Sequence, residues 1–481
     1  MGISRDDIKA LVADHLGCAA ADLADDENLI QMGLNSIRMM ALAGGWRKRG
    51  ADITFAQLAA SPTVESWHGL LCAQGLETPT QAQVAGRVVA EDDDAPFPLA
   101  DMQHAYWIGR ADEQELGGVA AHLYVEFDGS GVDPDRLEHA VAALVAAHPM
   151  LRARFLADGT QQIMPTPGRQ VFTVVDLRGR DADAAAAALA QLRDTKTHQR
   201  LRVEDGQVID ITLSLYEGRT RLHLDVDMLA GDAMSYRVLV SDLAELYRGS
   251  ALPTPSYSYR RYRTEQHPDR SAHDRDRAWW QQRLPELPGP PELPTVAAGQ
   301  RGTPDRTVRH DYWLDPDAKQ RLIEGAHARG ITPAMAVAAV FADTIGGWST
   351  QDTFLLNVPL FHREPLHPDI DRVIGDFTSS IMLAVDVSTD MSVADRSRAL
   401  QCGMYESGGH AAYSGLEVLR DMGRLRGEPV LAPVVFTSAL DLGELFSDTV
   451  IDTFGEPVWI VSQGPRCCST RRSPKCAAAC Y

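Results

Sequence analysis

The sequence predicts a protein of several domains, in which a small all-α unit of four helices precedes a larger α+β unit. Within residues 1–75 the apolar residues recur at helical spacing, whereas from residue 96 onward helical patterns alternate with strand-like ones. Residues 76–95 between them are polar, contain Pro and Gly and end on an acidic run, so they predict a flexible linker. A chain of 481 residues is long enough for about two to four domains.

Four candidate helices account for residues 1–75. Ser4 and Asp7 form a capping-box pattern at the start of the first helix. A second helix is expected to begin at Ser36 and a short third one near Phe55. The last helix is expected to open at Pro62, because proline suits the first turn of a helix. Short connections between such helices predict a compact bundle.

The composition, with 44% apolar and 23% charged residues, is that of a globular protein. A net charge of −20 argues against nucleic acid or an anionic membrane as a partner. No apolar run approaches the roughly 20 residues that span a bilayer, and the N-terminus lacks a signal-peptide pattern, so we expect a cytoplasmic protein. Zinc-ligand spacing, a P-loop and a dinucleotide fingerprint are all missing, and no metal is expected. Three scattered cysteines are expected to be reduced thiols: Cys18, Cys72 and Cys402.

A change of period near residue 227 marks the stretch in which we place the chemistry. Leu222, Leu224 and Val226 alternate with polar neighbours, which predicts a half-buried strand. From Ala233 onward the apolar residues recur at helical spacing, so a helix follows.

Two aspartates lie in the turn between this strand and this helix. Asp227 and Asp232 flank the turn, Gly231 is expected to allow its tight geometry, and Ser235 falls one turn into the helix. From spacing alone, a carboxylate at this place has an ordinary role, because it caps free N–H groups and complements the helix dipole. The residues by themselves leave that role and a functional one open.

The stretch Gly33-Leu-Asn-Ser36-Ile-Arg-Met-Met40 resembles the modification loop of carrier (thiolation) domains, most of all those that carry aryl acids in siderophore synthetases. This resemblance implies that the Ser36 hydroxyl takes 4′-phosphopantetheine from coenzyme A, which requires a phosphopantetheinyl transferase as a partner. A helix N-terminus would also favour the resulting phosphodiester. The alternative from the residues alone is that Ser36 is an ordinary N-cap.

The pattern Asp227-x4-Asp232-x2-Ser235 resembles the signature of heterocyclisation domains, which are condensation-family domains of nonribosomal peptide synthetases. Their condensation relatives have paired histidines here, and this chain has only His223 nearby. The resemblance covers residues 96–465 because companion motifs follow in family order. These motifs lie at Pro96–Arg110, with Tyr106–Arg110 as the distinctive part, and at Met150–Phe155, Arg363–Pro368, Ile374–Ser379 and Ala432–Asp441. Met150–Phe155 is expected to form a strand, and Val434–Phe436 a strand that presents Thr437 at its end.

The resemblance implies two chloramphenicol-acetyltransferase-like lobes, over residues 96–285 and 300–465, with a tunnel between them. It implies that an acyl thioester is joined to a carrier-bound Ser, Thr or Cys and that the amide is cyclised with loss of water. The candidate catalytic residues are Thr437, Asp227, Asp232 and Ser235; the aspartates are better interpreted as structural support that needs an Arg partner. The family attributes dehydration to a Thr and an Asp, and no Asp or Glu follows Glu456 to match the second.

The expected function is therefore to carry an aryl acid, salicylate above all, and to condense and cyclise it during siderophore biosynthesis. Expected partners are a stand-alone ligase that activates the aryl acid and downstream synthetase modules. The alternative is a truncated carrier remnant that is modified on Ser36 but cannot cyclise. Residues 466–481 are basic and Cys-rich, fit no zinc spacing and predict an aberrant tail.

Overall fold

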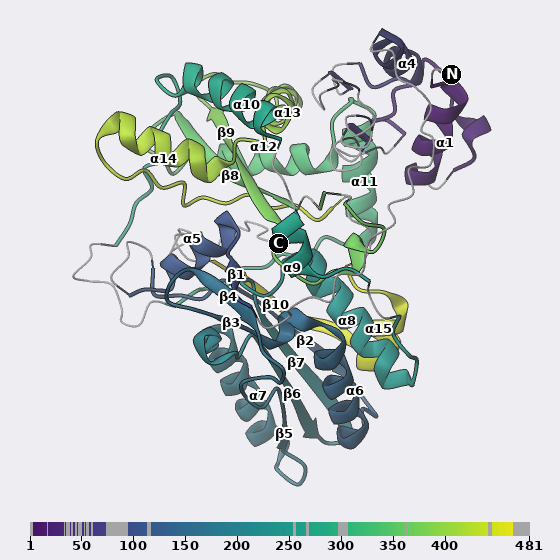
Figure 1. Ribbon diagram of the computed structural model, residues 1–481, viewed down its shortest axis with the longest axis vertical. Coiled ribbons are helices and arrows are strands. Elements are labelled where there is room, and N and C mark those ends of the chain that lie inside the picture. Colours follow the sequence, from purple (N-terminus) through teal and green to yellow (C-terminus); the bar gives the residue numbers. More distant parts are fainter. Residues whose placement is uncertain are drawn as a thin grey trace.

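The computed structural model contains a small helical unit at the N-terminus and two larger lobes (Figure 1). In Figure 1 the first lobe lies below and the second lobe above, with the N-terminal unit beside the second. The structure describes residues 3–16, 18–32, 34, 39, 42–43, 46, 51, 53, 57–58, 61–73, 95–112, 117–253, 256–265, 269–296, 306–361, 363–364, 366–440 and 445–464.

The N-terminal unit contains the first and last predicted helices, α1 (Arg5–Leu16) and α4 (Val64–Ala73), with a 3-10 turn at Ala20–Asp22. Trp67 of α4 is fully buried, and its ring meets that of Trp46 edge to face at 5.7 Å. Helix α4 was expected to open at Pro62, and this was wrong. It begins at Val64, and the Thr63 hydroxyl caps it by accepting the N–H of Ser66. The predicted starts at Ser36 and Phe55 and the predicted linker lie outside the described residues.

The core of the N-terminal unit includes one side chain from the second lobe. Tyr405, on α13 (Val393–Gly409), is 7% exposed and packs in the same apolar cluster as Ile8, Val12 and Trp67. The N-terminal unit therefore rests on the second lobe through an aromatic contact.

The first lobe is built on a five-stranded sheet in the order β10-β2-β7-β6-β5, in which only β5 and β6 run parallel. Its strands are β2 (His122–Gly129), β5 (Phe172–Asp176), β6 (Ile209–Tyr216), β7 (Arg219–Asp227) and β10 (Glu456–Gln463). A smaller sheet joins β1 (Phe97–Pro98), β4 (Thr160–Ile163) and β3 (Ala153–Phe155). The helices of this lobe are α5 (Asp101–Gly109), α6 (Pro134–Ala147), α7 (Ala182–Thr197), α8 (Ala233–Arg248), α9 (Tyr259–Glu265) and α15 (Asp448–Phe454).

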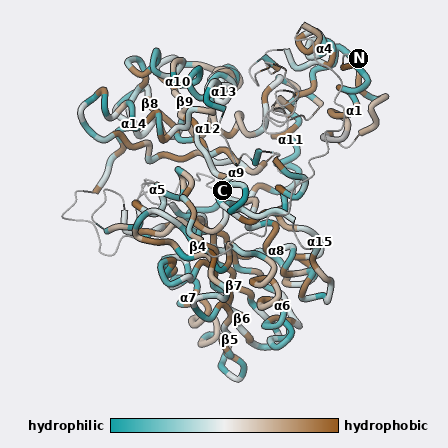
Figure 2. Tube along the Cα trace, in the orientation of Figure 1, coloured by the Kyte–Doolittle hydropathy of each residue, from teal (hydrophilic) through white to brown (hydrophobic). Residues whose placement is uncertain are grey.

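The two faces of the five-stranded sheet differ in chemistry. One face is apolar and packs against α6 and α8, and Figure 2 shows apolar residues along its strands. The other face is polar and lies toward α7 on the opposite side of the sheet (Figure 1). The residues of β7 from Leu222 to Asp227 are buried on both faces, so the prediction of a half-buried strand was wrong. Polar side chains occupy this interior because they pair with one another across the strands.

The second lobe pairs β8 (Thr353–Phe361) and β9 (Thr378–Asp386) as an antiparallel ladder. Its helices are α10 (Arg270–Arg283), α11 (Pro316–His327), α12 (Pro333–Gly346), α13 and α14 (Gly415–Arg426). Helix α12 buries Ala338, Ala339 and Ala342 but leaves Val340 53% exposed. The strand predicted before Thr437 is reduced to a single bridge between Asn357 and Val435.

Two expected lobe boundaries and one strand differ from the structure. The first lobe was expected to extend to residue 285, but Trp280 of α10 packs with β8, β9 and α14 in the second lobe. The second lobe was expected to extend to residue 465, but α15 packs on α8 and β10 pairs with β2, so both belong to the first lobe. The strand expected over residues 150–155 is mostly a 3-10 turn, Pro149–Arg152, followed by the short β3. All three differences arise from long-range packing, which periodicity within the sequence does not report.

The aromatic contact with the second lobe should support the N-terminal unit. We predict that Tyr405→Ala lowers the local stability of α4 by about 2 kcal/mol, the order expected for withdrawing one buried aromatic side chain. Amide hydrogen exchange in α4 measures this change, with Tyr405→Phe as a control that keeps the ring and the protection. Unchanged exchange of α4 in Tyr405→Ala would show that the contact is incidental.

Candidate active site

The turn from β7 to α8 has the predicted form, with a cap at its end. Asp232 is the N-cap of α8, and its carboxylate accepts the N–H of Ser235 at 2.7 Å. The ordinary role of a carboxylate at this place is therefore present. Gly231 does not adopt the left-handed conformation; a side chain there would lie 3.0 Å from Ser235 Cβ, so the glycine provides space rather than a special backbone angle.

Asp227, at the end of β7, is fully buried and paired with an arginine. Its Oδ2 accepts from Arg110 Nη1 at 2.6 Å, and its Oδ1 accepts the N–H of Leu229 at 3.1 Å. Burial raises the pKa of Asp227, and the charge of Arg110 opposes that shift. Arg110 also donates to the carbonyl of Leu201. The arginine that the sequence could not identify is thus the last residue of the Tyr106–Arg110 motif.

Asp232 pairs with an arginine from the other half of the domain. Arg363 Nη2 donates to Asp232 Oδ1 at 3.1 Å and to Ser235 Oγ at 3.0 Å. The Nη1 of the same guanidinium donates to the carbonyls of Ile370 at 3.0 Å and Val373 at 2.6 Å. Asp232 is 0% and Arg363 7% exposed at the side chain, so this is a buried ion pair.

The segment 370–377, between β8 and β9, is inserted into the first lobe. Gly375 accepts the N–H of Asp232 at 3.1 Å and the hydroxyl of Ser235 at 2.8 Å. A side chain on Gly375 would lie 2.1 Å from the ring of Tyr259, so only glycine fits this approach. The apolar residues of the segment join the first-lobe core: Ile370, Val373, Ile374 and Phe377. The motif aspartates therefore lie where the two halves of the domain interlock.

Asp376 in this segment is a carboxyl with an unusual charge state. It is 2% exposed, and its backbone carbonyl accepts the Tyr259 hydroxyl at 2.6 Å. Burial raises the pKa of Asp376 to about 7; Thr378 opposes the shift and the negative charge of Asp232 adds to it. The contact region between the two lobes, formed by the turn 227–235 and the segment 370–377, is called the junction below. Asp376 in this junction is substantially protonated near neutral pH.

Thr437 follows the segment that pairs with β8. The Asn357 carbonyl accepts the N–H of Phe436 at 2.9 Å, and Asn357 donates its own N–H to Val434 at 3.0 Å. Val434 and Phe436 are buried on one side of this segment, whereas Thr437 is partly exposed. In the described part of the chain, no hydrogen bond or ion pair links Thr437 to Asp227 or Asp232. Three of the predicted residues are thus brought together, and Thr437 stands apart from them.

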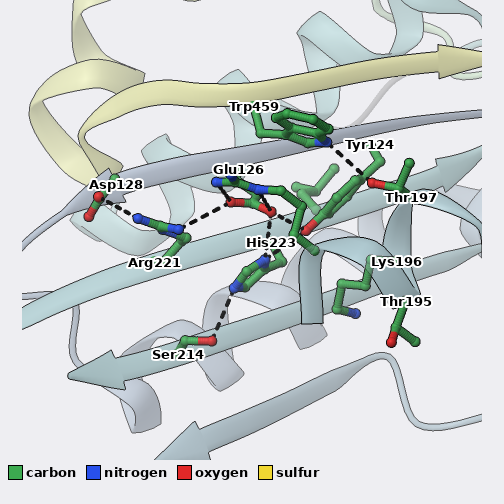
Figure 3. A network of polar contacts seen from close by, with 12 residues as sticks. Tyr124, Glu126, Asp128, Thr195, Lys196, Thr197, Ser214, Arg221, His223 and Trp459 are labelled. Atoms are coloured by element: carbon green, nitrogen blue, oxygen red, sulfur yellow. Dashed lines mark hydrogen bonds and ion pairs between the residues drawn. The ribbon is translucent and has the colours of Figure 1, made fainter. Parts of the chain in front are cut away.

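His223, four residues before Asp227 on β7, lies in the polar face of the sheet among the side chains of a separate polar network (Figure 3). Its Nδ1 lies 2.8 Å from the Tyr124 hydroxyl and its Nε2 lies 3.0 Å from the Ser214 hydroxyl. Burial lowers the pKa of His223 to about 2, so the ring is neutral. Glu126 accepts from Tyr124 at 2.7 Å and from Arg193 at 2.9 Å. This network satisfies buried groups and has a structural role.

Other residues that the sequence suggested are structural or outside the described part. The buried His148, at the end of α6, has its Nε2 2.9 Å from Asp242 Oδ2 and serves the packing of the first lobe. Ser36 and residues 466–481 lie outside the described residues. Within the described residues no cluster of His, Cys, Asp or Glu could hold a metal ion, and Cys18, Cys72 and Cys402 are free thiols. Among the described helices, none combines the length and hydropathy that crossing a bilayer requires.

Two families of known proteins match this chain. Residues 95–450 match the family described as "Condensation domain", and residues 6–71 match "Phosphopantetheine attachment site". The chain therefore belongs to the condensation-domain family of nonribosomal peptide synthetases and carries a phosphopantetheine-binding carrier domain in front. A carrier domain of this kind takes a 4′-phosphopantetheine group from a transferase.

Two similar proteins are a phenyloxazoline synthase and a pyochelin synthetase. The chain is 51% identical to "Phenyloxazoline synthase MbtB" of Mycobacterium tuberculosis over 466 residues, which is 95% of this chain and 33% of that protein. It is 38% identical to "Pyochelin synthetase PchE" of Pseudomonas aeruginosa over 96% of this chain and 32% of that protein. The chain thus spans about a third of the length of these relatives.

The solved structures agree with the architecture. The cyclization-docking bidomain of EpoB from Sorangium cellulosum aligns with a TM-score of 0.68 and 34% identity, over 78% of this chain and 77% of that one. The two-lobed fold expected from the sequence is confirmed.

The buried pair across the junction should support the whole condensation domain. We predict that Arg363→Ala lowers the free energy of unfolding by about 3–5 kcal/mol, because it leaves Asp232 charged, buried and unpaired. Urea titration followed by tryptophan fluorescence measures this change. The matched control is Arg178→Ala, which removes the exposed partner of Asp176 and should leave the unfolding curve in place. Equal effects of the two substitutions would contradict the assignment.

The raised pKa of Asp376 predicts a pH dependence with a definite sign. The folded protein binds this proton up to a pH of about 7, whereas the unfolded chain releases it near the ordinary value of 3.8. Asp376 should therefore make stability fall as pH rises between these values, by at most about 1.4 kcal/mol per pH unit. Asp376→Asn should remove that contribution, so the free energy of unfolding of the variant should rise relative to that of the native protein as the pH approaches neutrality. Parallel stability curves for the two proteins from pH 4 to pH 7 would refute the charge state.

Proposed function

We propose that this chain holds an aryl acid on the pantetheine arm of Ser36 and condenses it with a serine, threonine or cysteine held on another carrier. Salicylate is the aryl acid that we expect. The observation that carries the proposal is the presence of a carrier and a heterocyclisation-type condensation domain in one chain, 51% identical to a phenyloxazoline synthase. The name of that relative implies a phenyl group in the acid and a serine or threonine in the acceptor.

The geometry of the junction suits a positioning role for the motif carboxylates. Asp227 and Asp232 are each held by an arginine and are fully buried, so neither is free to take a proton from a substrate. We infer that they fix the turn before α8 and the inserted segment 370–377, and thereby the relation of the two lobes. Holding two thioesters in register supplies much of what the first chemical step needs.

The first step joins the amine of the acceptor to the thioester carbonyl. The C–N bond forms, the C–S bond breaks, and the amine proton leaves with the thiol. Cyclisation then adds the acceptor's hydroxyl or thiol to the new amide carbonyl. Dehydration forms a C=N bond and expels the former carbonyl oxygen as water, which requires proton transfer to that oxygen and from the nitrogen. Thr437, partly exposed at the end of its segment, is the residue that we propose for this proton transfer.

A second candidate function follows from the sequence after the last strand. Residues 457–481 contain no Asp or Glu, and the family attributes dehydration to a Thr together with an Asp in that part of the chain. The chain would then form the open amide without closing the ring, or act only as a carrier modified on Ser36. In either case a stand-alone ligase supplies the aryl acid, and downstream synthetase modules supply the acceptor.

The test follows both steps by mass. The protein is treated with coenzyme A, a phosphopantetheinyl transferase, salicylate and its ligase, and then with a seryl or threonyl carrier. We expect the open amide after thioester cleavage and no product lighter by one water, because a missing general acid–base group lowers the rate by about two to four orders of magnitude. Ser36→Ala is the control and should carry no adduct.

Each other outcome has a defined meaning. A product that has lost water would show that no second acid–base residue is required, and Thr437→Ala would then report whether the threonine acts alone. No amide from a loaded, folded sample would favour the carrier reading. A pantetheine adduct on Ser36→Ala would contradict the attachment site.

A further inference from the structure

The sheet register aligns three polar side chains next to the motif. His122 on β2 lies directly opposite Asp227 on β7 and opposite Gln463 on β10, so all three share the polar face of the sheet. Asp225 lies on the same face, two residues before Asp227 on the same strand. His122 is 1% exposed, and both aspartates are 0% exposed.

Two buried carboxylates on one strand face need positive charge nearby. Asp227 has Arg110, whereas Asp225 accepts from the neutral amide of Gln199 on one oxygen. The other oxygen of Asp225 lies 2.7 Å from His122 Nδ1. His122 is therefore the one basic side chain, among the described residues, that contacts Asp225.

The groups that face His122 come from β7, α7, β10 and its own strand β2. Asp225 and Asp227 are the charged groups on β7, and Arg110, which follows α5, contacts Asp227. On α7, the backbone of Thr197 also raises the pKa of His122, whereas the preceding side chain, Lys196, is held by Asp210 at 2.7 Å. The β10 neighbour, Gln463, is uncharged, and on β2 the phenol of Tyr124 is occupied by Glu126.

The charge state follows from this surrounding. Burial lowers the pKa of His122, but the carboxylate of Asp225, and then that of Asp227, outweigh burial and raise the pKa above the ordinary 6.5. The His122 ring therefore keeps its proton to a higher pH than an ordinary imidazole, and its positive charge faces the buried carboxyl groups of Asp225 and Asp227.

We propose that His122 is a positioning residue for the condensation reaction, whose imidazolium keeps Asp225 and Asp227 in place so that Asp227 can anchor Arg110. This inference rests on the proposed function for its kinetic part. Arg110 is the C-cap residue of α5, and Asp227 begins the turn to α8. The contact between them therefore holds the end of α5 against this turn. Loss of the proton leaves two buried carboxylates with one arginine, and the strand end loosens.

The sign of the pH effect follows from the raised pKa. The stabilising contribution of His122 is complete below the ordinary pKa of 6.5 and is lost as pH rises through the higher pKa of the folded state. The condensation rate should therefore fall on the alkaline side, and kcat rather than KM should change.

The experiment has a spectroscopic part that needs no turnover. In the full chain labelled with ¹⁵N histidine, the His122 resonance should titrate above pH 6.5, and Asp227→Asn should lower that pKa. The second part measures amide formation against pH in the native protein and in His122→Asn, which keeps a donor near Asp225 but carries no charge. His122→Asn should form the amide more slowly below neutral pH, and its rate should lack the fall on the alkaline side (the alkaline limb) that the native protein shows. The matched control is His139→Asn, because His139 is exposed on α6 and its ring contacts the carbonyl of Asp135 in its own helix.

The two parts separate two kinds of failure. A His122 that titrates at or below 6.5, or that ignores Asp227→Asn, overturns the inference whatever the enzyme does. An alkaline limb that persists in His122→Asn also overturns it. If the native protein forms no amide at any pH while His122 titrates as expected, the proposed function fails and the charge arrangement stands.

Discussion

The contact of Arg363 with Asp232 and Ser235 holds the two halves of the condensation domain in one arrangement. Arg363 follows β8 in the second half, whereas its partners open α8 in the first. The same guanidinium binds the carbonyls of the inserted segment, which places that segment's apolar residues in the first-lobe core. A planar guanidinium suits this task because its donors point in fixed directions to several acceptors at once. We infer that the main role of the pattern Asp227, Asp232 and Ser235 in this chain is to hold the two lobes together.

The polar face of the first-lobe sheet shows how the fold tolerates so many buried ionisable groups. Glu126 is met by Arg193 and by Tyr124, whose hydroxyl also contacts the neutral His223. Trp459 of β10 lies under the guanidinium of Arg193 at 4.7 Å, which secures the last strand to the sheet. A satisfied network of this kind is compatible with a stable interior, whereas removal of one member leaves an unpaired group at high cost.

Local patterns in the sequence predicted most elements near the site. The helical period of α8 and the capping position of Asp232 follow from neighbouring residues, and both are confirmed. The strand period of β7 was also correct, but its burial was not, because the polar partners on β2 and β6 are far away in sequence. Alternation reveals that a strand has two different faces and does not reveal what covers each.

The contacts of the site that the sequence did not predict join residues that are far apart along the chain. Arg110 and Arg363 both lay inside recognised motifs, yet nothing in the sequence assigned each to its aspartate. The return of β10 to the first lobe and the position of His122 opposite Asp227 depend on sheet register. Register is set by packing of whole strands, so pairing of this kind becomes visible only in the folded structure.

The most direct test of this contact between the lobes is a double-mutant cycle between Arg363 and Asp232. Arg363→Met, Asp232→Asn and the double variant are compared by urea unfolding, with asparagine chosen because it still caps α8. If the ion pair holds the halves together, the two substitutions should be non-additive, with a coupling energy of about 1–3 kcal/mol. Additivity within about 0.5 kcal/mol would contradict the account, because the two residues would then stabilise the domain independently.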